Sequence, residues 1–271
     1  MLRRLAGAAA LAAFITAGPA MAQEPVRLYA AGSLKAVMEE IANAFRQDSG
    51  LAVAGTFGPS GLLRDRIAKG ENAEVFASAN MAHPRALADA GQSGEVHAFA
   101  RNQLCALAAP GVDVTTETLL DRMLDARFKL GTSTPAADPS GDYAWELFRK
   151  ADAVRPGALQ ALDRKALKLT GGPASPPPPK DRSVYGALVE KGEADIFLTY
   201  CTNAVLARKE VPPLKIVAVP DALSVGAEYG LAVVKGARLE AVRFADFVRS
   251  PMGRTILVRH GFGLPPAPPR K

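Results

Sequence analysis

Segments patterned like buried β-strands alternate with segments patterned like amphipathic helices along nearly the whole chain. Residues 26–31 form a short apolar run, and apolar side chains then recur at helical spacing until Gly50, a natural helix end. The same alternation predicts strands over 51–58, 73–79, 102–110, 129–134, 195–200, 214–220 and 228–236, and helices over 60–70, 140–154, 156–169, 182–194 and 238–260, the last kinked or split at Pro251. This order predicts an α/β fold with mainly parallel sheets.

A chain of 271 residues can form one large sheet or two lobes, and we favour two lobes joined by crossing strands. Residues 170–181 are rich in glycine and proline, so we expect a rigid surface loop there.

Residues 1–22 have a positive head, an apolar stretch and a small-residue end at "AMA". This order is typical of a secretory signal peptide cut after Ala22, and the apolar stretch falls short of the ~20 residues that span a bilayer. The sequence therefore predicts a periplasmic protein. In that oxidising compartment Cys105 and Cys201 can form a disulfide, and two buried thiols are the alternative.

The formal net charge is +6, and the basic residues are scattered among acids. There is no basic stripe with interleaved aromatics, so we expect no nucleic-acid partner. A mild positive excess favours a small anion instead.

Three serines, Ser33, Ser60 and Ser140, stand at expected helix starts that follow strands. A serine there often caps its helix, which stabilises it by about 1 kcal/mol. Alternatively, the free N–H groups of helix starts bind an anion, and such starts gather at the carboxyl ends of parallel strands. The pattern leaves both interpretations open.

Catalysis and metal binding have little support. Leu62 replaces the second glycine of a G-x-S-x-G motif, and Ala36 stands where an S-x-x-K lysine would be. His83, His97 and His260 lie in unrelated contexts without ligand spacing. We therefore expect no enzyme, no metal and no cofactor.

Residues 28–80, with "AGSL", "GPSG" and "AEVFASA", resemble the start of the molybdate-binding proteins of bacterial ABC transporters. Residues 183–204 resemble that family's "V-x-G-A-L" stretch and the strand ending in tyrosine, and residues 244–265 resemble its closing helix. The likeness covers nearly the whole mature chain.

The resemblance implies two lobes, each a mainly parallel sheet flanked by helices, with a ligand cleft between them. Lobe 1 is expected over 23–103 and 222–262, lobe 2 over 104–221, and a disordered tail over 263–271.

The ligand contacts that the resemblance implies are Ser33, Ser60, Ser140, Val184 and Tyr200. They would enclose a tetrahedral oxyanion, molybdate or tungstate, with uncharged donors and without a lysine or arginine. Such a site suits a fully deprotonated dianion, because it offers no acceptor to a protonated one. The implied partner is a membrane ABC permease, and we expect a monomer.

Two stretches depart from the family pattern, 136–143 in place of "V-P-A-G" and the proline-rich 171–179. Both touch lobe 2, so another anion or a small organic solute is the alternative ligand, and a periplasmic hydrolase is a weaker alternative. Tyr143, Trp145 and Tyr185 could shape the cleft there or could simply pack helices.

Overall fold

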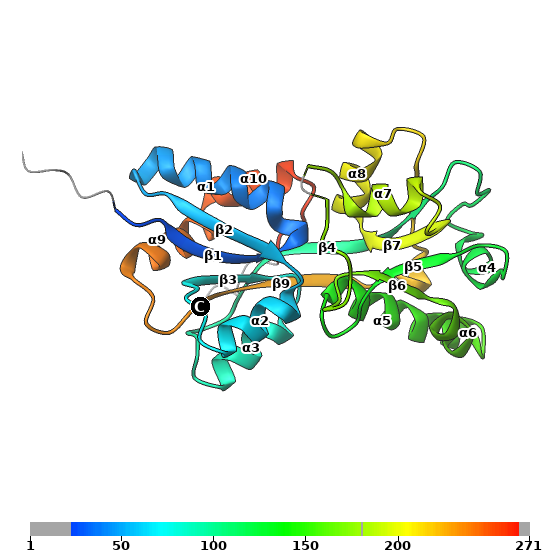
Figure 1. Ribbon diagram of the computed structural model, residues 1–271, viewed down its shortest axis with the longest axis horizontal. Helices are drawn as coiled ribbons and strands as arrows, with labels where there is room; N and C mark the ends of the chain where they lie inside the picture. The colour runs from blue at the N-terminus through cyan, green and yellow to red at the C-terminus, as the bar shows by residue number, and fades with distance from the viewer. Residues whose placement is uncertain (1–22, 180, 266–271) are drawn as a thin grey trace, which may run out of the picture.

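The computed structural model describes residues 23–179 and 181–265. The expected signal peptide, residues 1–22, lies outside them. The two halves of the molecule lie side by side, each a sheet with helices on both faces, and the strands β4 and β9 run between them (Figure 1). Among the described residues, no helix combines the length and apolarity needed to cross a bilayer.

The first lobe is built on strands that follow the order β2-β1-β3-β9-β4. Its strands are β1 (Val26–Ala31), β2 (Val53–Gly58), β3 (Val75–Ser78), β9 (Gly226–Val233) and the first part of β4 (His97–Ala108). Its helices are η1 (Gly32–Leu34), α1 (Lys35–Ser49), α2 (Ser60–Ala68), α3 (Ala82–Asp89), α9 (Leu239–Arg249) and α10 (Pro251–Arg259). Only β9 runs against the other strands of this lobe.

The second lobe continues the order as β4-β7-β5-β6, with β8 also paired to β4. Its strands are β5 (Leu130–Ser133), β6 (Leu167–Thr170), β7 (Ile196–Tyr200), β8 (Lys215–Ala218) and the end of β4. Its helices are α4 (Leu119–Leu124), α5 (Pro139–Val154), α6 (Ala158–Lys165), α7 (Val184–Glu190), α8 (Cys201–Glu210) and η2 (Asp221–Leu223). Here β4 is the strand that runs against the others.

Strand β4 belongs to both sheets. It pairs with β9 as far as Gln103 and with β7 from Leu104 onward, so the change of sheet falls between these two residues. The fold is therefore the α/β, two-lobed, mainly parallel arrangement that the sequence predicts.

Local sequence explains most element ends. Helix α1 buries Val37, Met38, Ile41 and Phe45 on one face and ends at Gly50, whose φ of 76° suits a residue without Cβ. The long C-terminal helix is split as expected, because Pro251 begins α10 and the preceding serine caps it.

Two expectations are wrong. The predicted helix over 156–169 ends at Lys165, and residues 167–170 form β6 beside β5, where tertiary pairing outweighs helical spacing. The tail predicted over 263–271 begins too early, because Gly263 exchanges two backbone hydrogen bonds with Arg101. Residues 266–271 lie outside the described part.

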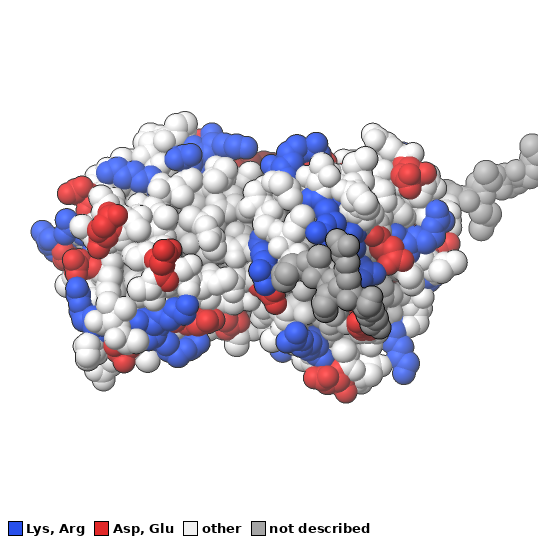
Figure 2. All heavy atoms as spheres, turned by 180° about the vertical axis from the view of Figure 1, so that it is seen from behind, with Lys and Arg blue, Asp and Glu red and all other residues white. Residues whose placement is uncertain are grey.

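Basic and acidic side chains are interspersed on the uncovered part of the face in Figure 2, and no stripe of one sign crosses it. This arrangement agrees with the charge pattern of the sequence.

Candidate functional site

None of the three serines caps its own helix. Ser60 is buried and its Oγ accepts the backbone N–H of Ala79 at 3.1 Å, so its hydroxyl hydrogen is free to donate elsewhere. Ser33 Oγ lies 3.1 Å from the hydroxyl of Tyr229. Ser140 is fully buried, and its Oγ has no hydrogen-bond partner among the described residues. The structure thus removes the capping interpretation.

The two lobes touch where α2 begins. The backbone N–H of Gly61 donates to the carbonyl of Ala137, in the segment before α5, at 2.8 Å. A Cβ on Gly61 would lie 2.2 Å from the carbonyl oxygen of Ala136, so only glycine permits this approach. Ala136 itself has a φ of 65°, an uncommon backbone conformation for a residue with a side chain. The lobes are therefore closed at this point.

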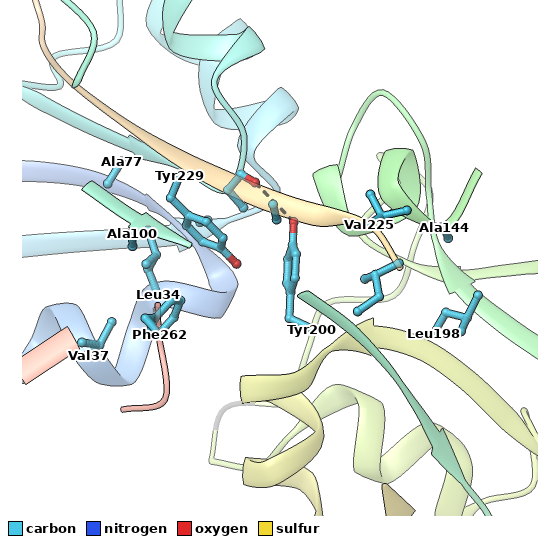
Figure 3. Packing of buried hydrophobic residues seen from close by; sticks show 14 of the residues in the cluster. Leu34, Val37, Ala77, Ala100, Ala144, Leu198, Tyr200, Val225, Tyr229 and Phe262 are labelled. Atoms are coloured by element: carbon cyan, nitrogen blue, oxygen red, sulfur yellow. Dashed lines mark hydrogen bonds between the residues drawn. The ribbon is translucent and has the colours of Figure 1, made fainter. Parts of the chain in front are cut away.

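Two buried tyrosines meet beside the serines. Tyr200 at the end of β7 and Tyr229 on β9 have ring centroids 5.6 Å apart, and Figure 3 shows them between the two halves. The Tyr200 hydroxyl donates to the carbonyl of Ala79, in the other lobe, at 3.3 Å. The Tyr200 hydroxyl, which we predicted to bind a ligand, therefore joins the two lobes in this structure. To bind a guest oxygen, it would have to give up its hydrogen bond to the Ala79 carbonyl.

Burial raises the pKa of both Tyr200 and Tyr229 well above the ordinary value for tyrosine. Both phenols therefore stay protonated and uncharged at any physiological pH, so each keeps a hydrogen to donate.

Val184 is the first residue of α7, and Ser183 caps that helix by accepting the N–H of Gly186 at 3.3 Å. Val184 also lines a pocket of about 480 Å³ whose other wall is the proline-rich loop. It thus stands at a helix start, as predicted.

Contacts link four of the five predicted residues, and Val184 lies instead at the pocket beside the proline-rich loop. Ser33 reaches Tyr200 through Tyr229, and Tyr200 reaches Ser60 through Ala79. The Gly61–Ala137 bond then leads to the start of α5, which carries Ser140. The described hydrogen bonds and ion pairs of these serines and of Tyr200 include no lysine or arginine.

An acid that the sequence analysis did not single out, Asp138, lies within this group. It is the N-cap of α5, and its Oδ1 accepts the N–H of Ser140 at 3.1 Å. Burial raises its pKa to about 6. An aspartate two residues before Ser140, followed by proline, is a helix-start signal that could have identified it.

The three aromatic residues of interest differ in position. Tyr143 packs edge-on against Tyr200 with centroids 6.3 Å apart, and the half-buried Tyr185 ring packs on Phe197. Trp145, on α5, instead donates to Asp163 of α6 at 2.8 Å and packs on Phe148, so for this residue the packing interpretation holds.

A disulfide joins Cys105 on β4 to Cys201, with Cα atoms 4.8 Å apart. Cys201 directly follows Tyr200, so the bridge ties the end of β7 to the strand that connects the lobes. Among the described residues, no group of three or more histidine, cysteine or acidic side chains could hold a metal ion.

Two sheets joined by crossing strands, with polar side chains at helix starts facing one another across the junction, define the two-lobed periplasmic-binding-protein fold. The chain belongs to the family of bacterial extracellular solute-binding proteins, whose model matches residues 26–263.

Similar proteins fit this family. An uncharacterized protein of Pasteurella multocida is 36% identical over 222 residues, covering 82% of this chain and 90% of that protein. The molybdate-binding protein ModA of Escherichia coli is 30% identical over 271 residues, covering 96% of this chain and 97% of that protein. A solved structure, the periplasmic molybdate-binding protein of Azotobacter vinelandii, matches with a TM-score of 0.69 at 18% identity, covering 89% of this chain and 99% of that one. The characterized proteins among these are binding proteins.

Proposed function

We propose that this protein captures a tetrahedral oxyanion, molybdate or its analogue tungstate, in the periplasm and delivers it as a monomer to a membrane ABC permease. The observation that carries the proposal is that Ser33, Ser60 and Ser140 converge on the junction of the lobes while none of them caps a helix. The 30% identity to ModA over 96% of the chain supports molybdate as the guest.

The donors suit an anion. Ser60 keeps a free hydroxyl hydrogen, and Ser140 has a buried hydroxyl without a partner. Hydrogen bonds to a charged group are about twice as strong as those between neutral groups, so a few such donors hold a dianion without a fixed cation. Closure of the lobes would shield these bonds from water, and a permease could then distinguish the closed from the open form.

Isothermal titration calorimetry with molybdate, tungstate and sulfate tests the proposal. Ser60→Ala removes one donor to a charged guest, which costs about 1.5–3 kcal/mol, or roughly a 10- to 150-fold higher Kd. The matched control is Ser93→Ala, because the Ser93 hydroxyl is exposed and donates only to the neighbouring Gly94 carbonyl.

The control should bind as the wild type does. Equal affinity of Ser60→Ala and wild type for molybdate would contradict the assignment. Preferential binding of sulfate or an organic solute over molybdate would contradict molybdate as the ligand but would still support the proposed site.

A further inference from the structure

The start of α5 already carries an internal anion. Asp138 Oδ1 accepts the N–H of Ser140, which is the backbone donor expected to face the guest. The carboxyl packs closely against the turn after β6, since a Cβ on Gly171 would lie 2.7 Å from Asp138 Oδ2. A guest that binds at the start of α5 therefore meets the Asp138 carboxyl, and the Ser140 N–H there is already hydrogen-bonded.

One buried hydroxyl beside this carboxyl has no partner. Ser140 is fully buried, and its Oγ has no hydrogen-bond partner among the described residues. The Ser133 hydroxyl, also buried, lies close enough to Asp138 and Tyr185 to lower the pKa of both side chains. Buried polar groups are nearly always bonded, so the unpartnered Ser140 hydroxyl points to a missing polar guest.

The groups facing Asp138 from its neighbours carry no positive charge. They are Asp142 on its own helix, the phenol of Tyr185 on α7, that of Tyr200 at the end of β7, and the hydroxyl of Ser133 on β5. No described lysine or arginine contributes to the pKa of Asp138. An ionised Asp138 therefore lies near the expected anion without a cation between them.

Resting on the proposed function, we propose that Asp138 is a specificity-determining residue that makes the site bind one proton together with each anion. The proton lies between the Asp138 carboxyl and a guest oxygen. With a fully deprotonated guest such as molybdate or sulfate, Asp138 carries the proton and donates it. With a guest that carries its own O–H, such as hydrogen phosphate, the carboxylate accepts.

This changes the expected selectivity with pH. A dianion binds only the protein with Asp138 protonated, so its apparent affinity falls with the protonated fraction. From the pKa of about 6, that fraction is about one half at pH 6 and about one hundredth at pH 8, a roughly 50-fold loss. A guest that brings its own proton escapes this loss, so the preference shifts towards hydrogen phosphate as the pH rises.

The test is calorimetry with molybdate and with inorganic phosphate at pH 6, 7 and 8, in buffers of different ionisation enthalpy that report proton uptake. The variant is Asp138→Asn, because asparagine caps a helix as well as aspartate does. The control is Asp152→Asn on the same helix, whose carboxylate accepts only from the N–H groups of Gly157 and Leu159.

Wild type and Asp152→Asn should bind molybdate about 50-fold more weakly at pH 8 than at pH 6 and take up nearly one proton at pH 8. Asp138→Asn should lose both effects and bind molybdate more tightly than wild type at pH 8. Equal molybdate affinity of wild type at pH 6 and pH 8 would overturn this inference alone. Absence of molybdate binding to all three proteins at pH 6 would overturn the proposed function and this inference with it.

Discussion

Replacing Gly61 by alanine should block closure of the lobes while leaving each lobe intact. The added Cβ would lie 2.2 Å from the Ala136 carbonyl oxygen and 2.8 Å from that of Ala137, and both atoms belong to the other lobe. Alanine is favoured over glycine inside a helix by about 1 kcal/mol, so α2 itself does not suffer. The penalty therefore falls on the closed state.

The size of the effect follows from the contact. Real Cβ atoms essentially never approach other atoms within 3.0 Å, so the lobes must separate by roughly 1 Å at this point. Such a separation stretches the donors of one lobe away from a guest held by the other. Loss of two hydrogen bonds to a charged guest, at about 1.5 kcal/mol each, gives about 3 kcal/mol, or a roughly 150-fold higher Kd.

Calorimetry with molybdate measures the affinity, and small-angle X-ray scattering with and without molybdate measures the closure. The matched control is Gly58→Ala in the same lobe, where a Cβ would meet only the Leu63 side chain at 3.9 Å. Gly58→Ala should bind and contract as wild type does. If Gly61→Ala bound molybdate with wild-type affinity and contracted equally, the closing contact would not limit binding and the reasoning would be refuted.

Reduction of the Cys105–Cys201 disulfide should lower the free energy of unfolding by about 4.7 kcal/mol, because the bridge closes a loop with a sequence separation of 96; guanidinium unfolding with and without reductant measures this, and a change below about 1 kcal/mol would contradict it. His83 is buried and its pKa is lowered to about 4, so it is neutral in the fold. The contribution of the neutral His83 side chain to the free energy of unfolding is complete above pH 6.5. It falls by up to about 3 kcal/mol as the pH drops from 6.5 to 4. Urea unfolding of His83→Phe should therefore depend less on pH over this range than that of wild type; identical slopes in the two proteins would refute the assignment.

Local patterns predicted the elements whose cause is local. The helical spacing of α1, its end at Gly50 and the split at Pro251 follow from side-chain pattern and backbone geometry alone. The segment 167–170 was misassigned because its strand state depends on pairing with β5, a partner distant in sequence. Gly263 was placed in a tail for the same reason, since its pairing partner is Arg101.

The candidate site shows the same division. The positions of Ser33, Ser60 and Ser140 at helix starts could be predicted from the sequence. What their hydroxyls do could not, because the partners of Ser60 and Ser33 lie 19 and 196 residues away. The sequence analysis also did not single out the Asp138 carboxyl at the start of α5, because its contact with the turn after β6 depends on the fold.

The site and the connection between the lobes share residues, and this links binding to motion. Tyr229 lies on β9, one of the two connecting strands, and its hydroxyl contacts both Ser33 and the side chain of Asn102 on β4, the other one. The Tyr200 hydroxyl reaches across to the first lobe at Ala79. Rotation of one lobe about β4 and β9 must break the bond between Tyr200 and Ala79, which joins the two lobes. A guest that takes the hydroxyl of Tyr200 for itself therefore competes with a contact that closes the empty protein, and its affinity is the difference between the two sets of bonds.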